Sequence, residues 1–327
     1  MQDSPSLSLP QCLTTWLDSL PMNTKRSYGL PWRDLLHFTG KPPEDITPDD
    51  IAGWLHDLAN RTVNGIHRGK RNWSRRGYAE STIALWCSAI SGFYSFAQAA
   101  GWVVRNPVQA VSRPKVPIYG EAKFLALDEV RALLRAMRRD TVHDKRNYAL
   151  SLMLIITGRR SSEVCQVRWC DFQQAGDRVL WLRPDLPATD ADHLPASLWR
   201  AITDYLTAAG RLETIRPDDY IFTALSDNAS RFPAVEHESD PEMRPLSERE
   251  VARLVKRYAR LAGLDPKKVM LSTLRHTAAK LRREAGDSVS SISALLGIST
   301  ASTQALLRRA SDAGCQAWVR VEAMLGL

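Results

Sequence analysis

The sequence predicts a mainly α-helical protein of two domains, and three observations support this prediction. A chain of 327 residues is long enough for two hydrophobic cores. Apolar residues recur at helical spacing through most of it, whereas 178–182 has the composition of a strand. A polar stretch at 112–120, punctuated by Pro and Gly, reads as a linker. We therefore expect domains at 1–114 and 122–327, joined by a linker at 115–121.

Composition and charge favour a soluble protein with a polyanionic partner. The hydrophobic fraction of 44% and the charged fraction of 24% are ordinary, and the net charge of +8 favours nucleic acid before a membrane. The five cysteines are scattered without a Cys-x-x-Cys pair, which favours reduced thiols in a cytoplasm over zinc or disulfides. Neither a signal peptide nor a membrane helix is expected.

The first domain is expected to be a bundle of short helices. An amphipathic helix should span Leu9 to Leu20, and Asn23 can cap a second helix in which Pro31 introduces a kink or a break. Thr47, followed by a proline and two acidic residues, predicts the start of a third helix. Ser81 is expected to open a fourth helix.

A basic loop is expected between the third and fourth of these helices. Its candidate DNA-binding residues are Arg68, Lys70, Arg71, Trp73, Arg75 and Arg76. Lysine and arginine side chains at this density can follow a phosphate backbone, with the indole available to stack or pack. The alternative is a solvated basic loop, and these residues alone do not decide between the two.

The second domain is expected to begin with a helix at Leu127 and to contain a buried helix at 148–156. A strand follows at 178–182, and Ser247 with Glu250 predicts a capping box for a helix that ends near Gly263. The acidic and histidine-containing insertion at 227–245 lacks metal-ligand spacing and reads as an exposed loop, so neither a metal nor a cofactor is predicted.

Two stretches carry a resemblance to a known family. The first is Thr157-Gly-Arg-Arg-Ser-Ser-Glu163, continued as far as Asp171; the second is Leu271-Ser-Thr-Leu-Arg-His-Thr277, followed by Leu295-Leu-Gly-Ile298. They resemble the tyrosine recombinase (phage integrase) family, whose motifs read Thr-Gly-x-Arg-x-x-Glu, His-x-x-Arg-His-Thr and Leu-Gly-His before a tyrosine nucleophile. The resemblance covers nearly the whole chain. It implies a helical core-binding (SAM-like) domain, then a mainly α catalytic-type domain with a small antiparallel β-sheet.

The resemblance assigns a phosphate-binding role to Arg160 and Arg275, with His276 packing beside Arg275. Guanidinium groups bind phosphate bidentately whether or not a reaction follows. The alternative is a pair of surface or salt-bridging arginines. Glu163, three residues after Arg160, can hold its guanidinium in position. Within a DNA-binding family, the basic loop is also better explained as a phosphate contact.

Four catalytic groups of the family are replaced in this chain. Ser272 stands for the first His, Ile298 for the second, and Leu306 or Leu307 for the tyrosine; no tyrosine follows Tyr258. The hairpin expected at 184–195 lacks the family's lysine. The positive clamp is therefore kept, whereas the nucleophile and the proton-transfer groups are not.

The sequence thus predicts a catalytically inactive, sequence-specific binder of double-stranded DNA, a regulator of transcription or of the maintenance of a mobile element or plasmid. One alternative is a non-cutting subunit that works with an active recombinase; another is an enzyme with an unrecognised nucleophile. The apolar tail at 316–327, which its own domain is not expected to bury fully, could form a homo-oligomer. We expect a bacterial cytoplasmic protein associated with the nucleoid or a plasmid.

Overall fold

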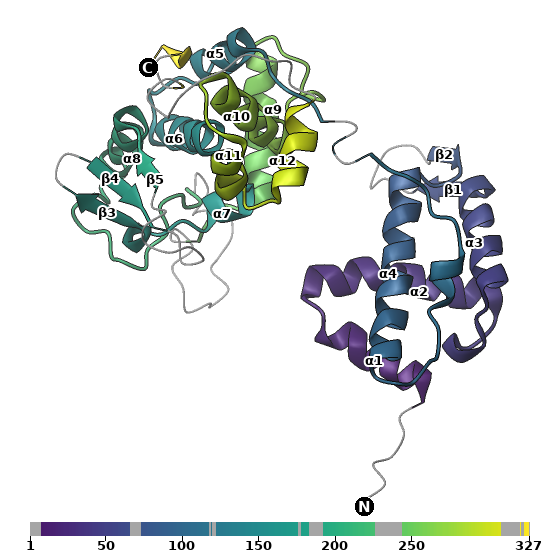
Figure 1. Cartoon of the computed structure of the whole chain (residues 1–327). Helices are drawn as coiled ribbons and strands as arrows, with labels where there is room; N and C mark the ends of the chain where they lie inside the picture. Colours follow the sequence, from purple (N-terminus) through teal and green to yellow (C-terminus); the bar gives the residue numbers. More distant parts are fainter. Residues whose placement is uncertain are drawn as a thin grey trace, which may run out of the picture. The chain divides into compact units, whose positions relative to one another are not determined.

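The computed structural model describes residues 8–65, 73–117, 119, 122–175, 178–182, 192–225, 244–308, 321 and 324–326. The chain divides into two compact units, Met1–Pro117 and Ile118–Leu327, and each is described by itself (Figure 1). The division falls within the expected linker at 115–121. In the described ranges, no helix is long and apolar enough to span a bilayer.

The first unit is a bundle of helices around an aromatic core. Trp32 packs edge-on against Phe93 with ring centroids 5.1 Å apart, and Trp54 stacks on Trp86 at 5.9 Å. The helices are α1 (Leu9–Ser19), α2 (Met22–Thr39), α3 (Pro48–Asn60) and α4 (Glu80–Ala99), with short 3-10 turns η1 (Pro43–Asp45) and η2 (Pro107–Ala110).

The start of α3 is confirmed, whereas α2 begins earlier than predicted and is not broken at Pro31. The Thr47 hydroxyl accepts from the Asp50 backbone N–H at 3.2 Å, while the Asp50 carboxylate accepts from the Thr47 N–H at 2.9 Å. Helix α2 begins after Pro21 rather than at Asn23, and it continues through Pro31. Its apolar face buries Trp32, and this packing outweighs the hydrogen bond that proline removes.

The stretch expected to be a basic loop contains a β-hairpin. Strand β1 (Thr62–Gly65) pairs antiparallel with β2 (Trp73–Arg76), so that Thr62 faces Arg76. Gly77 ends the hairpin with φ 68°, and a Cβ there would lie 2.1 Å from the Ala59 carbonyl oxygen. Only glycine fits where the strand returns to α3.

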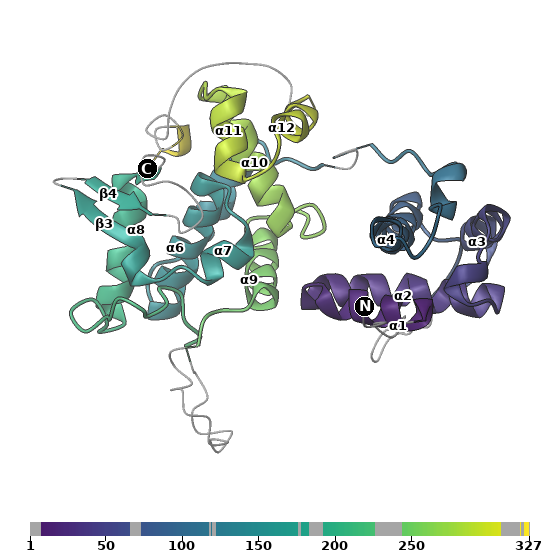
Figure 2. The same ribbon diagram turned by 60° about the horizontal axis from the view of Figure 1, so that its bottom comes forward.

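The second unit is mainly helical with a small antiparallel sheet, as expected. Its helices are α5 (Leu127–Arg135), α6 (Val142–Thr157), α7 (Ser161–Cys165), α8 (Ala196–Ala208), α9 (Glu248–Leu261), α10 (Leu271–Glu284), α11 (Val289–Leu296) and α12 (Thr300–Leu307), with a 3-10 turn η3 (Trp169–Asp171). Strands β3 (Phe172–Ala175), β4 (Arg178–Trp181) and β5 (Asp192–Leu194) pair in that order. The sheet lies beside α8, and α10, α11 and α12 gather on the opposite side (Figures 1 and 2).

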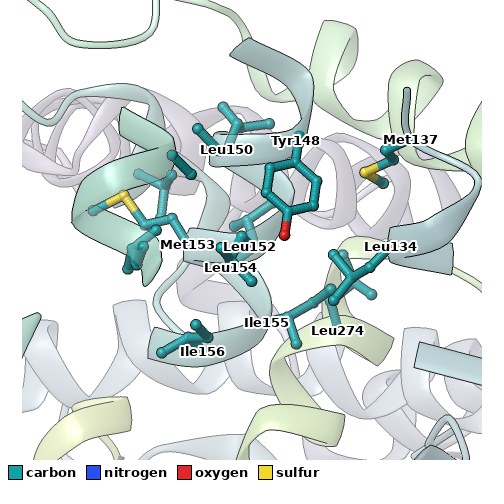
Figure 3. Packing of buried hydrophobic residues seen from close by; sticks show 14 of the residues in the cluster. Leu134, Met137, Tyr148, Leu150, Leu152, Met153, Leu154, Ile155, Ile156 and Leu274 are labelled. Atoms are coloured by element: carbon teal, nitrogen blue, oxygen red, sulfur yellow. The ribbon is translucent and has the colours of Figure 1, made fainter. Parts of the chain in front are cut away.

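Helix α6 is the centre of the second unit's core. Its apolar residues pack with Leu134 of α5 and Leu274 of α10, as Figure 3 shows from close by. Burial on nearly every side explains the continuous apolar run at 148–156. The capping box of α9 is confirmed, because the Ser247 hydroxyl accepts from the Glu250 N–H at 3.3 Å.

Two apolar residues near the end of the chain are buried. Val321 and Leu325 are 1% and 6% exposed and belong to the core of their own unit. Arg131 adds a hydrogen bond from Nε to the Met324 carbonyl oxygen at 3.0 Å. This part of the tail is therefore covered within the chain, while the rest of 309–327, apart from Gly326, lies outside the described residues.

Candidate functional site

The candidate site begins where α6 ends. Gly158 caps the helix in the left-handed conformation, and its N–H donates to the Leu154 carbonyl at 3.1 Å. A Cβ on Gly158 would lie 2.9 Å from the Ala278 Cβ and 3.2 Å from a Leu296 methyl carbon. This close approach brings α6, α10 and α11 together and directs the next residues out of the core.

Arg160 is exposed at the N-cap of α7 and is held by Glu163. Its backbone N–H donates to one carboxylate oxygen at 2.7 Å, and Nη1 donates to the other at 3.0 Å. Nη2 lies 3.5 Å from the carbonyl oxygen of Gly297, in the turn between α11 and α12. The salt bridge between Arg160 and Glu163 that the sequence suggested is thus present, and it leaves the Arg160 guanidinium at the surface.

Arg275 reaches the same turn from the middle of α10. Its Nη1 donates to the Gly158 carbonyl at 2.9 Å, and its Nη2 donates to the Leu296 carbonyl. The two arginines therefore contact consecutive carbonyl groups, those of Leu296 and Gly297. The structure brings together two residues that are far apart in the chain.

The electrostatics of this arrangement favour an anion. Burial lowers the pKa of Arg275, and the positive charge of Arg160 lowers it further; Glu163 acts in the opposite direction, and Arg159 adds to the positive field. The lowered pKa means that burial, together with the neighbouring arginines, disfavours the charge on Arg275. A bound anion would relieve this unfavourable field, and the planar guanidinium groups suit the oxygens of a phosphate.

His276 follows Arg275 and lies half-buried among aromatic rings. Its ring centroid is 5.5 Å from that of Tyr119 and 6.0 Å from that of Phe124. Burial lowers its pKa, a backbone hydrogen bond with Lys123 opposes this, and the Arg275 charge lowers it again. Nδ1 is buried without a hydrogen-bond partner. The residue therefore packs between these rings beside Arg275, and its surroundings disfavour the protonated form.

Four residues were matched to catalytic positions of the family by the resemblance alone, namely Ser272, Ile298, Leu306 and Leu307. Ser272 is exposed at the start of α10. Leu306 and Leu307 are 1% and 8% exposed and pack with Ala279, Ile292 and Leu296, a set that we call the α10–α12 cluster. Ile298 is partly buried against it. The two leucines contribute packing, and neither offers a group that could attack phosphorus.

The hairpin residues belong to the first unit, whereas the arginine pair belongs to the second. Arg75 and Arg76 are exposed on β2; the Arg75 guanidinium lies 5.9 Å from the Tyr78 ring centroid, and Arg76 Nη2 lies 3.4 Å from Asn60 Oδ1. The backbone of Trp73 pairs with Gly65. Arg68, Lys70 and Arg71 lie outside the described residues.

A row of cations on α9 was missed by the sequence reasoning, which used only the helix start. Arg249, Arg253, Lys256 and Arg260 are exposed, and their spacing of four, three and four residues places them on one face. We call them the α9 basic stripe. The Ser161 hydroxyl donates to Glu248, the first residue of α9, so the stripe begins close to Arg160. The alternation of cations with buried valines was the available signal.

Replacing Gly158 by alanine is expected to destabilise the protein by about 2–4 kcal/mol, from the positive φ and from contact with Ala278 and Leu296. Gly210→Ala is the matched control, because Gly210 has φ +65° and no atom within 4 Å of an added Cβ. That control should cost only about 1 kcal/mol for backbone strain. Denaturant unfolding measures both, and equal losses would contradict the close approach.

Comparison with known proteins identifies the family. The model of the phage integrase family matches residues 123–308. A protein named tyrosine recombinase from Synechococcus elongatus is 29% identical over 263 residues, which cover 78% of this chain and 74% of the relative. The XerH site-specific recombinase bound to palindromic difH substrate superposes with a TM-score of 0.64 at 15% identity, over 93% of this chain and 82% of that one. A lambda integrase dimer bound to a COC′ core site superposes with a TM-score of 0.62 at 18% identity, over 95% of this chain and 99% of that one.

The fold and the family match agree on the class of protein. The mostly helical catalytic-type unit with its small antiparallel sheet is shared with integrases and recombinases of known structure. The chain belongs to the phage integrase, or tyrosine recombinase, family.

Proposed function

We propose that this protein binds double-stranded DNA at specific sites and holds a backbone phosphate between Arg160 and Arg275 without cleaving the strand. The observation that carries the proposal is the pair of guanidinium groups on one turn, where burial and the nearby Arg160 lower the pKa of Arg275. Structural neighbours bound to DNA and recombinase core sites support the choice of duplex DNA as the ligand.

Two further basic surfaces fit the same ligand. The α9 basic stripe starts beside Arg160, so it can extend the contact along the phosphate backbone from the arginine pair. The β1–β2 hairpin presents Arg75 and Arg76 from the other unit. Phosphate contacts of this kind fix the position of a protein on duplex DNA and leave the reading of bases to other side chains.

The absence of cleavage rests on what replaces the nucleophile. Strand transfer requires a group that attacks phosphorus and keeps the bond energy in a covalent intermediate. Leu306 and Leu307 cannot attack, and their burial makes them part of the α10–α12 cluster. We place the protein as a regulator of transcription or maintenance for a bacterial mobile element or plasmid.

Two alternatives stay open to experiment. Relatives named tyrosine recombinase favour an active enzyme, in this chain with a different nucleophile. A non-cutting subunit that assembles with an active recombinase, or with further copies through the tail, would need paired sites on the DNA. Genome-wide mapping of the bound DNA gives both the target and its symmetry, and a single unpaired target would favour the regulator.

Arg160→Ala is expected to weaken binding to the selected duplex by about 1–3 kcal/mol, which is the loss of a charged hydrogen bond. Arg275→Ala should act similarly, with an added loss of thermal stability because Arg275 holds two backbone carbonyls. Preference among sequences should not change. Titration by fluorescence anisotropy measures the affinity, and Arg160→Lys tests whether a point charge replaces the planar group. A variant that binds DNA with wild-type affinity but melts at a lower temperature would show that the arginine only stabilises the fold through its salt bridge or hydrogen bonds.

Replacing Arg68, Lys70, Arg71, Arg75 and Arg76 by glutamine should flatten the salt dependence of binding. Each lost phosphate contact lowers the slope of log affinity against log salt by about 0.9, so the slope should fall by about 4.5 if all five residues contact phosphates. Affinity measured from 50 to 200 mM salt gives the slope. An unchanged slope would mean that the hairpin is only solvated.

A further inference from the structure

An unusual residue lies at the start of the second unit. Tyr119 has φ 57°, and among the residues that the structure describes it is the one non-glycine with positive φ. This conformation is unfavourable for an aromatic residue and persists where surrounding contacts determine it. Its carbonyl oxygen accepts from the Ala122 N–H at 3.0 Å, which closes a tight turn.

The contacts of the Tyr119 ring explain why the turn is held. The ring meets His276 edge-on, with the planes at 86° and the centroids 5.5 Å apart. It also packs against the α10–α12 cluster, which contains Leu306 and Leu307. A tyrosine from the beginning of the unit therefore covers the cluster where the family's own tyrosine is missing.

The hydroxyl group of Tyr119 is available to a ligand. The ring is half-buried, and the hydroxyl makes no hydrogen bond with any group in the described part of the chain. Tyr119 is one of the groups that act on Arg275: burial and the Arg160 charge lower the pKa of Arg275, whereas the tyrosine acts to raise it. The ring also packs on the cluster that contains Leu296, whose carbonyl oxygen Arg275 contacts, so Tyr119 lies beside the turn that the two arginines share.

We propose that the Tyr119 hydroxyl donates a hydrogen bond to the phosphate held by Arg160 and Arg275, as a third ligand of the same group. This inference rests on the proposed function. A phenol carries one donor, and a phosphate oxygen accepts such a bond strongly because it is charged. No described side chain accepts the hydroxyl proton, so the group acts as a donor and no covalent bond forms.

The substitution that isolates this donor is Tyr119→Phe, which keeps the ring against His276 and the cluster. With the full-length protein and a duplex recovered by in vitro selection, the variant should bind about ten-fold more weakly at an unchanged melting temperature. Tyr220→Phe is the matched control, because its hydroxyl accepts from Arg168 and lies outside the site. That control should bind as the wild type does.

A second measurement identifies the contacted phosphate. Duplexes that each carry one neutral methylphosphonate are scanned across the footprint, with wild-type protein, Arg160→Ala and Tyr119→Phe. At one phosphate position, the loss of affinity caused by the methylphosphonate and the loss caused by either substitution should not add. The modified DNA, Arg160→Ala and Tyr119→Phe would each remove part of the same contact. Additive losses at every position for Tyr119→Phe would overturn the proposal.

The failure of this inference can be told apart from the failure of the proposed function. Wild-type binding by Tyr119→Phe together with weak binding by Arg160→Ala would rule out the Tyr119 contact and keep the arginine site. Wild-type binding by both would remove the phosphate site as well. A covalent protein–DNA adduct that is lost in Tyr119→Phe would also overturn the donor role, because the phenol would then be a nucleophile.

Discussion

Purified protein incubated with a nicked duplex of its selected site is expected to give no denaturant-resistant protein–DNA band. The nucleophile position is apolar and buried at Leu306 and Leu307, and Ser272 and Ile298 replace both histidines. Loss of one member of a catalytic unit already costs orders of magnitude in rate, although such losses do not add. Without a nucleophile, no covalent intermediate can carry the strand.

The nicked substrate makes this test sensitive, because a cleaved flap diffuses away and traps any adduct. A band that disappears on replacing one Ser, Thr or Cys would contradict the prediction and revive the enzyme hypothesis. Mixing the protein with an active relative on paired sites tests whether the relative can donate a tyrosine in trans. An adduct that forms only in the mixture would support the accessory subunit.

Replacing the four residues of the α9 basic stripe by glutamine is expected to weaken binding and to flatten its salt dependence. Four lost phosphate contacts lower the salt slope by about 3.6, so the drop in affinity between 50 and 200 mM salt should shrink by about 10²-fold. The substituted side chains are exposed on one face, with Val251, Val255 and Tyr258 buried on the other, so the fold should be kept. Circular dichroism and thermal melting check this.

A matched control removes charge from a helix outside the stripe. Arg135 on α5 and Arg138 just after it are both exposed. Their replacement by glutamine lowers the net charge by two and, per charge removed, should change the slope far less than the stripe does. An equal change per charge would mean that the net charge of the protein, rather than the position of the stripe, governs binding.

The elements that the sequence predicted best carry local chemical signals. Thr47 and Ser247 start α3 and α9 because their hydroxyls cap backbone N–H groups within the same four residues. The errors in α2 arise where tertiary packing decides, since burial of Trp32 keeps the helix through Pro31. The stretch after α3 contains an Asn-Gly pair at 64–65, but this pair lies within β1 and does not mark the turn between the two strands.

The candidate site also contains some residues that the sequence could predict and others that only the fold reveals. Arg160 and Arg275 could be selected from their motifs, but their shared turn at Leu296 and Gly297 depends on how α6, α10 and α11 pack. Tyr119 could not be found from the sequence, because the expected linker at 115–121 gave it no role and no pattern joins it to His276. Contacts between distant segments are set by the fold, which local periodicity does not encode.

If the protein binds DNA without cleaving it, as we propose, the burial of Leu306 makes a return to cleavage difficult. A tyrosine placed there would bring a larger ring and a hydroxyl into a position that is 1% exposed, among side chains already in contact. Overpacking costs about 1–3 kcal/mol, and a buried hydroxyl without a partner costs about as much again. A lineage at this point would have to repack α10, α11 and α12 before one substitution could restore a nucleophile. Under the proposed function, the packing around Leu306 would therefore make the loss of cleavage hard to reverse.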